Sequence, residues 1–176
     1  MNVKGGDKFA KVMRDLGDKL TKAESVNVGF LAGATYPNGT PVAMVAAVQE
    51  FGAPRVGVPP RPFFRTMIAN KGPEWPRAVA ALLKANDFDA KATLEQTGAA
   101  IKGQLQQSIV DTNDPPLSPV TLMLRKMVGP NGQVTSYSQV VEARARVAAG
   151  EDAGGVSTKP LVWTGQLLNS VDYVVK

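Results

Sequence analysis

Near the start of the chain, apolar side chains recur at helical spacing. Asp7 precedes them, and its carboxylate can accept hydrogen bonds from the free N–H groups at a helix start. Charged residues fill most of the positions between the apolar ones. We predict an N-terminal helix within residues 1–24, whose apolar stripe packs either on this domain or on a neighbouring subunit. The stripe consists of Phe9, Val12, Met13, Leu16 and Leu20.

Two other segments alternate with a period of two, which is typical of β-strands. The first is Val26–Ala32, in which Val26, Val28 and Phe30 share one face. The second is Val171–Val175 at the end of the sequence. We expect both segments to lie in one sheet.

The longest apolar stripe lies in the middle of the chain and predicts a long helix that ends near Val110. Either Asp87 or Asp89 can cap its start. A stripe of this length must be buried against another element, so we expect the helix to cover the two strands. The stripe is formed by Leu94, Ile101, Leu105 and Ile109.

Proline and glycine divide the region before the long helix into short pieces. Thr40 and Pro41 form a helix entry, with a hydroxyl cap followed by a proline that needs no N–H. The helix Val42–Phe51 follows, and Gly52 suits the left-handed position at its C-terminal end. The prolines of Ala53–Arg61 fix φ and remove donors, so we expect this segment to be extended.

Further short helices are predicted on either side of the long helix. Pro62 can open a helix that runs through Asn70, and another begins near Pro76. After the long helix the prolines of residues 111–119 break the chain, and Ser118 can cap a brief helix.

The periodic signal weakens over Met127–Thr158. This part contains the turn signal Pro130-Asn131-Gly132 and a possible short helix at Gln139–Ala149, and it ends in small, polar residues. We interpret the segment, residues 127–158, as an insertion or mobile arm that is exposed and ordered mainly by neighbouring subunits. Beyond it, Thr164 caps one turn of helix through Ser170.

Together these elements predict a single α+β domain over residues 1–176. It would contain a small, mostly antiparallel sheet packed by a long helix, with short helices and extended proline-rich loops. A chain of 176 residues is long enough for one well-buried core. No apolar run approaches the roughly 20 residues that span a bilayer, and the first residues lack the apolar core of a signal peptide. We therefore expect cytosolic synthesis and no membrane partner.

The composition removes much catalytic chemistry, because the chain has no His and no Cys. Thiolate nucleophiles, zinc sites with Cys or His ligands and Ser-His-Asp triads are excluded. A carboxylate-only metal site or a Ser–Lys pair stays formally open. The net charge of +5 is modest, and the basic stretch Phe51–Lys84 fits a solvated face with some partner contacts better than a DNA-binding groove. We expect no enzyme, no cofactor and no metal.

Polar clusters offer two candidate sites. Asp111-Thr112-Asn113-Asp114 has closely spaced oxygen ligands, but it lacks the Gly and the distal Glu of an EF-hand, so helix termination is the favoured interpretation. Glu50 with Arg61 and Arg65 could suggest acid–base work, but neither a His nor a second carboxylate completes such a site. We expect a structural ion pair there.

Large apolar side chains beside prolines and glycines complete the candidate set. We expect Phe51 and Phe63 in the core, whereas Trp163 suits a core and an interface equally well. Phe64 and Asn169 are further candidates for a structural or interface role.

These candidates fall in two segments, which we call the first and second signature. The first signature contains Gln49-Glu50-Phe51-Gly52 and then Pro59-Pro60-Arg61-Pro62-Phe63-Phe64-Arg65. The second is Lys159-Pro160-Leu161-Val162-Trp163-Thr164-Gly165-Gln166-Leu167-Leu168-Asn169-Ser170-Val171. In their order around the strand, the long helix and the proline-rich break, they resemble the neck, or tail-completion (head–tail joining, virion morphogenesis), proteins of long-tailed bacteriophages. The resemblance covers Val26–Lys126 and Lys159–Val175, and Trp163 stands where many members have Asp.

The resemblance implies a noncatalytic subunit of a homo-oligomeric, hexameric ring in the virion neck, assembled in the host cytoplasm. Its other partners would be the head-side connector or adaptor protein and the tail terminator or tail tube protein. DNA would pass the lumen without specific binding. Rigid proline-rich loops suit such docking, because they lose little entropy on binding. The alternatives are a nucleic-acid-binding accessory protein, favoured by the basic middle stretch, and a carboxylate-dependent hydrolase, which the absence of His disfavours.

Overall fold

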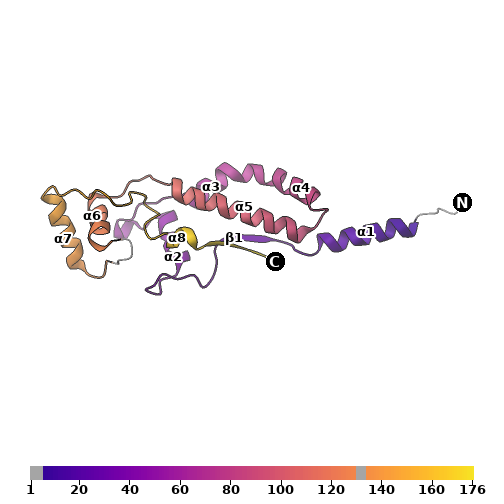
Figure 1. Ribbon diagram of the computed structural model, residues 1–176, viewed down its shortest axis with the longest axis horizontal. Coiled ribbons are helices and arrows are strands. Elements are labelled where there is room, and N and C mark those ends of the chain that lie inside the picture. The colour runs from indigo at the N-terminus through magenta and orange to yellow at the C-terminus, as the bar shows by residue number, and fades with distance from the viewer. Residues whose placement is uncertain (1–5, 130–133) are drawn as a thin grey trace.

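The computed structural model describes residues 6–129 and 134–176, which form an elongated body with one projecting helix (Figure 1). The architecture is α+β, as predicted, with a two-stranded antiparallel sheet and a long helix packed against it. The predicted turn at 130–132 lies outside the described residues. In chain order the elements are α1 (Gly6–Leu20), β1 (Val26–Phe30), α2 (Val42–Phe51), η1 (Pro54–Val56), α3 (Phe63–Lys71), η2 (Gly72–Glu74), α4 (Trp75–Ala85), α5 (Ala90–Asp111), α6 (Pro119–Val128), α7 (Tyr137–Ala148), α8 (Gln166–Asn169) and β2 (Val171–Val175).

The two predicted strands pair with each other, although they lie near opposite ends of the sequence. Val26 lies opposite Val175 and Phe30 opposite Val171, and β1 ends at Phe30, earlier than predicted. Helix α5 packs on both strands. It comes closest at Gly98, where a Cβ atom would lie 2.5 Å from Tyr173 Cδ2. The absence of a side chain at this position therefore allows the helix to rest directly on the sheet.

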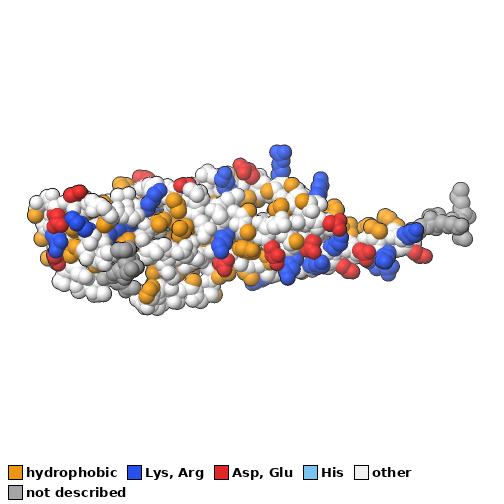
Figure 2. Space-filling model, viewed as in Figure 1, with side chains coloured by type: hydrophobic (Ala, Val, Ile, Leu, Met, Phe, Trp, Pro, Cys, Tyr) orange, Lys and Arg blue, Asp and Glu red, His pale blue; other side chains and the backbone are white. Residues whose placement is uncertain are grey.

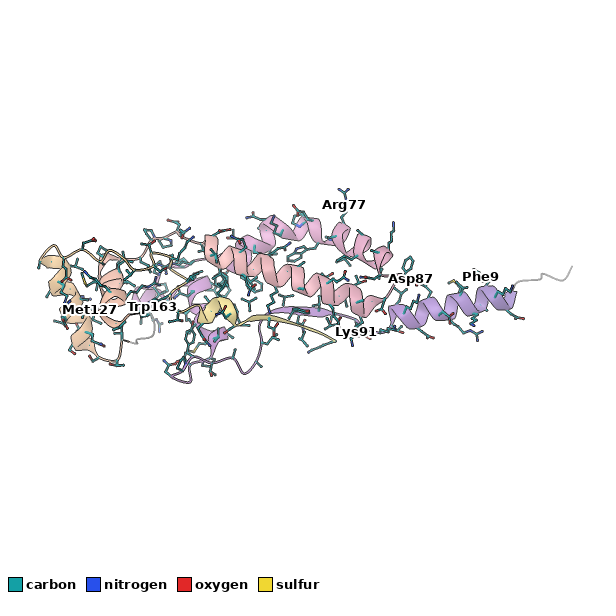
Figure 3. The ribbon with its side chains drawn as sticks, viewed as in Figure 1. Phe9, Arg77, Asp87, Lys91, Met127 and Trp163 are labelled. Atoms are coloured by element: carbon teal, nitrogen blue, oxygen red, sulfur yellow. The ribbon has the colours of Figure 1, made fainter. Side chains whose placement is uncertain are left out.

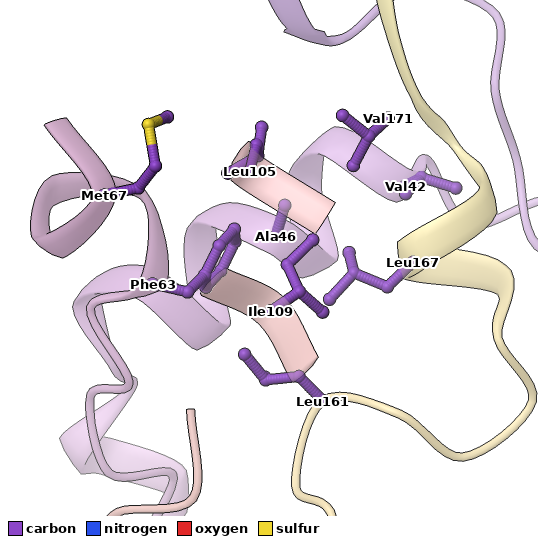
Figure 4. Packing of buried hydrophobic residues seen from close by; sticks show 9 residues of the cluster. All are labelled: Val42, Ala46, Phe63, Met67, Leu105, Ile109, Leu161, Leu167 and Val171. Carbon is purple, nitrogen blue, oxygen red and sulfur yellow. The ribbon is translucent and has the colours of Figure 1, made fainter. Parts of the chain in front are cut away.

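The core lies where α5 meets the sheet, α2, α3 and α8. Helices α3 and α4 run along α5 on the side away from β1 (Figure 1). Burying one large aliphatic or aromatic side chain is worth about 1.5–3 kcal/mol, so this cluster supplies much of the stability. The side chains converge in Figure 4: Val42, Ala46, Phe63, Met67, Leu105, Ile109, Leu161, Leu167 and Val171.

Helix starts follow the predicted caps in part. Of the two candidates for α5, Asp89 is the cap, and its Oδ1 accepts from Ala92 N at 3.0 Å. Ser118 caps α6 in the same way. Thr40 is not a cap, because α2 begins after Pro41, and Val42 N donates to Ala34 O. Asp7 lies inside the first turn of α1 and not before it, where its charge still favours the helix N-terminus.

The segment Ala53–Arg61 was predicted to be extended, and part of it is not. Its prolines instead enclose a short 3₁₀ turn at Pro54–Val56, closed by paired hydrogen bonds between Ala53 and Val58. Gly52 has the predicted positive φ of 76°, but its ψ of 169° is not left-handed helical. A Cβ there would lie 2.8 Å from Pro60 N, so the tight return of the chain requires glycine.

The predicted arm packs on the neighbouring helix α6, which the sequence pattern did not indicate. Helix α7 packs against α6, and Ala143 is completely buried between them. Ser136 and Gln139 form a capping box at the start of α7, and Lys126 Nζ lies 3.2 Å from Glu151 Oε1. Much of the surface of α7 is nevertheless exposed, including Tyr137. Ordering by neighbouring subunits stays a prediction.

Helix α1 projects from the body (Figure 1). Ion pairs hold its C-terminal end. Lys19 pairs with Asp87, and Lys22 Nζ lies 2.9 Å from Asp89 Oδ2. Phe9 and Val12 of the predicted stripe are 69% and 61% exposed. The sequence left open whether the stripe packs on this domain or on a neighbouring subunit. These exposed side chains do not pack on this domain. None of the helices within residues 6–129 and 134–176 is both long and apolar enough to cross a bilayer.

Candidate functional site

Glu50 is a buried carboxylate that caps a helix from outside that helix. Helix α3 begins after Pro62, which has no side-chain cap to offer. Glu50, at the end of α2, accepts instead from Phe64 N at 2.8 Å and from Arg65 N at 3.1 Å. Arg65 Nε donates to the same carboxylate at 2.8 Å, and Arg65 Nη2 donates to Glu50 O. The predicted ion pair is thus confirmed for Arg65, and it joins the ends of α2 and α3.

The predicted ion pair between Glu50 and Arg61 is not formed. The backbone N of Arg61 donates to Gln49 O at 2.7 Å, and its guanidinium binds groups other than the Glu50 carboxylate. Nε donates to Pro115 O and Nη1 to Gln49 Oε1, each at 3.2 Å. Arg61 is only 5% exposed. Its guanidinium therefore connects α2, the loop before α3 and residues 111–119.

The aromatic residues of the first signature divide between core and surface. Phe63 is in the core, as predicted, and meets the ring of Phe30 edge to face. Phe64 is half-buried beside Phe63. The prediction for Phe51 is wrong, because it is 64% exposed. Helix α2 buries Val42, Ala46 and Glu50, spaced by four residues, so the next position turns outwards, and Phe51 lies against the guanidinium of Arg65.

The second signature is held to α6 by Arg125, which the sequence analysis did not single out. Nη1 of Arg125 donates to Ser157 O at 2.6 Å and to Lys159 O at 2.9 Å, and Nη2 donates to Pro160 O. Trp163, labelled in Figure 3, is half-buried, and the centroid of its ring lies 5.4 Å from Arg125 Cζ. One signal was available in the sequence, because Arg125 stands on the same helix as the apolar Leu122, Met123 and Leu124.

Lys159 and the residues around α8 make further contacts between the second signature and the rest of the molecule. Lys159 Nζ donates to Val110 O at 2.8 Å, where the carbonyl groups at the end of α5 lack helical partners. Thr164 Oγ1 accepts from Gln166 N, as predicted, although Gly165 is the residue that precedes α8. Asn169 is exposed at the end of α8. Both signatures thus contact α5 and the core that it organises.

An open groove of about 960 Å³ separates the two signatures. Its lining includes Gln49 and Arg61 of the first signature, Thr121 and Arg125 of α6, and Trp163 of the second signature. Burial lowers the pKa of the Arg61 guanidinium, and the charge of Asp114 opposes that change. Burial, followed by the charge of Arg61, lowers the pKa of Arg125. Both groups stay protonated at neutral pH, so the groove is positively charged.

Within the described residues, no cluster of three or more acidic side chains is arranged to hold a metal ion. Asp111 accepts from Gln107 Nε2, and its backbone carbonyl accepts from Asn113. This local bonding matches the helix-terminating role favoured for 111–114.

No protein-family model, curated protein or solved structure matches the chain.

Proposed function

We propose that this chain is a structural subunit of the neck of a long-tailed bacteriophage, one copy in a ring that joins the head connector to the tail. The order of the two signatures supports the proposal through their resemblance to neck proteins. Their chemistry agrees with a structural role. The Glu50 carboxylate accepts three hydrogen bonds from α3. Arg61 binds Pro115 O and Gln49 Oε1, and Arg125 binds three backbone carbonyls.

The observation that carries the proposal is the exposure of large apolar side chains on two separate parts of the protomer. Phe9, Val12 and Met13 lie exposed on the projecting α1, whose apolar side chains are visible in Figure 2. Phe51 and Val56 are 64% and 75% exposed near the end of α2. Apolar surface of this kind marks interaction sites. Two different patches on one subunit suit a head-to-tail interface, which closes into a ring.

The experiment is removal of this chain from the phage that encodes it. We expect full heads and separate tails in electron micrographs, with few infectious particles. Supplying the intact chain in trans should restore joined particles. Joined, infectious particles without the chain would contradict the proposal.

The runner-up is a nucleic-acid-binding accessory protein, which the exposed Lys71, Arg77 and Lys84 on α3 and α4 favour. Such binding would be retained on immobilised DNA at low salt and lost steeply as salt rises. The modest net charge of +5 and the interspersed acidic side chains make this the weaker proposal.

A further inference from the structure

The groove between the two signatures has an unusual distribution of charge. Its lining is largely apolar and includes Leu124, Leu161 and Trp163. Among the described lining residues, the charged ones are Arg61 and Arg125, both positive and each 5% exposed. Within the described chain, neither guanidinium lies within 4.0 Å of a carboxylate. The groove thus holds positive charge without an intramolecular counter-charge in direct contact.

The two arginines differ in what they can still bind. Both terminal nitrogens of Arg125 donate to backbone carbonyls, those of Ser157, Lys159 and Pro160. Arg61 uses Nε and Nη1, whereas its Nη2 has no acceptor within the described residues. That nitrogen is not sealed from solvent, because no buried side-chain nitrogen or oxygen in the described chain lacks a partner. Arg61 Nη2 is therefore an unused donor, held in place by the bonds of Nε and Nη1, that is not completely covered by the described chain.

An anionic group with apolar neighbours fits this groove best. A carboxylate matches the guanidinium in charge and geometry. The half-buried Leu124 and Trp163 would remain exposed to water beside a simple ion, so the occupant needs apolar side chains as well. A nucleic-acid strand would require a longer row of cations along its phosphates than this groove provides.

The chain itself is a poor source of the acidic group. Six of its 15 acidic side chains are already in ion pairs: Glu50, Asp87, Asp89, Glu142, Glu151 and Asp172. The overall charge of +5 also opposes approach of a second copy through this positive groove. A segment from a different, acidic protein meets neither obstacle.

We propose that the groove binds an extended acidic segment of a partner protein, with one carboxylate accepting from Arg61 and apolar side chains lying against Leu124 and Trp163. The proposal goes beyond the neck function and does not depend on it, because an accessory protein of another kind could use the same groove.

The test uses the full chain and a fluorescein-labelled peptide of alternating Leu and Glu, followed by fluorescence anisotropy. We expect saturable binding that Arg61→Gln weakens about tenfold. Arg77→Gln removes the same charge from exposed α4, far from the groove (Figure 3), and should leave binding within about twofold. The matched peptide of Leu and Lys should not bind. Equal binding of the two peptides, or no saturable binding of the first, would overturn the proposal.

A second variant keeps the test sharp if Arg61→Gln unfolds. Thr121 is the third residue of α6 after the cap Ser118, so Thr121→Glu completes a capping box and should not destabilise the fold. The new carboxylate stands in the groove wall and should abolish peptide binding. Ala81→Glu adds the same charge on exposed α4 and should have little effect.

Other occupants give different results with the same proteins. Competition by inorganic phosphate at the same concentration as the peptide would indicate a simple anion site and overturn the proposal. If a single-stranded oligonucleotide binds, and Thr121→Glu abolishes that binding, the occupant is nucleic acid and the proposal is wrong. If Thr121→Glu changes self-association in sedimentation velocity while the peptide fails to bind, the occupant is another copy of this chain, and the proposal is wrong.

Discussion

Glu50 illustrates how a single residue of the first signature holds several segments together. A helix leaves its first N–H groups without partners, and Pro62 cannot supply a capping side chain to α3. A carboxylate from the preceding helix takes that role and also binds Arg65. Both carboxylate oxygens therefore accept hydrogen bonds within the chain, so Glu50 has a structural role.

Replacement of Glu50 should therefore cost stability. Glu50→Ala leaves Phe64 N and Arg65 N without their acceptor, and we expect a loss of about 2–3 kcal/mol in the free energy of unfolding. Urea denaturation followed by circular dichroism measures it. Glu95→Ala, an exposed glutamate of α5, is the control and should change stability by less than about 0.5 kcal/mol. A loss no larger than that of the control would show that the cap is unimportant.

Residue roles were predictable from the sequence where they depend on local pattern. The Glu50–Arg65 pair and the burial of Phe63 are confirmed. Exposure of Phe51 depends on which face of α2 meets the core. The helix is apolar from Val42 to Val48, so its sequence does not reveal that face, and the buried Glu50 lies on it. The role of Arg125 depends on carbonyls of residues 157–160, a loop whose position follows from tertiary packing.

At the scale of elements, the packing of α5 on the sheet depends on a residue without a side chain. A Cβ at Gly98 would overlap Tyr173 and Val26, at 2.5 and 2.8 Å. We expect Gly98→Ala to lower the free energy of unfolding by about 1–3 kcal/mol, because helix and sheet must separate. Thermal and urea unfolding measure the change.

Gly103 provides a matched control in the same helix. A Cβ there meets nothing within 4 Å, and the residue is exposed. Gly103→Ala should stabilise the protein by about 0.5–1 kcal/mol, because alanine favours the helix over the unfolded chain. Equal effects of the two substitutions would mean that α5 does not rest on the sheet at Gly98.

The N-terminal cap of α5 should give stability a dependence on pH. The hydrogen bond from Ala92 N, and then Lys22, lower the pKa of Asp89 below its ordinary value of 3.8. A depressed pKa in the folded state stabilises the protein above pH 3.8, and this contribution is lost as pH falls through the folded value. Asn can still cap the helix but does not titrate. As pH falls from about 5 to about 2, the free energy of unfolding should therefore decrease less for Asp89→Asn than for the natural chain.

Urea midpoints at several pH values test this expectation. The pKa of Asp172 is also lowered, chiefly by Lys102, but that group titrates in both proteins and cancels in the difference. Asp18→Asn on the exposed α1 is a control for the change in net charge. Parallel curves for Asp89→Asn and the natural chain would contradict the role of Asp89.

Helices and strands were predicted well where periodicity and caps coincide. The stripe and cap of α5, the Ser118 cap of α6 and the two alternating strands lie within a few residues of their expected positions. The turn at Pro54–Val56 was missed, because proline restricts φ without deciding how Gly57, at φ 72°, redirects the chain. Packing of α7 on α6 was missed because it depends on the small Ala143, which adds little to an apolar pattern.

For the whole molecule, α1 is the most conspicuous feature (Figure 1). Its exposed stripe has little to do with the stability of the body, so it should serve assembly. We propose that the chain self-associates through this stripe. Phe9→Ser with Val12→Ser should then reduce the sedimentation coefficient measured by sedimentation velocity and leave thermal unfolding nearly unchanged. Lys8→Ser with Lys11→Ser alters other positions of α1 and should preserve assembly. Oligomers that persist in the first variant would exclude the stripe as an interface.

The most direct test of the proposed neck function is the position of this chain in the virion. Phage carrying the chain with a C-terminal epitope tag, labelled with gold-conjugated antibody, can be imaged by electron microscopy. We predict gold at the junction of head and tail, with the same virions free of gold when the tag is absent. Purified, infectious virions that contain no tagged chain, or gold confined to another part of the particle, would contradict the proposal.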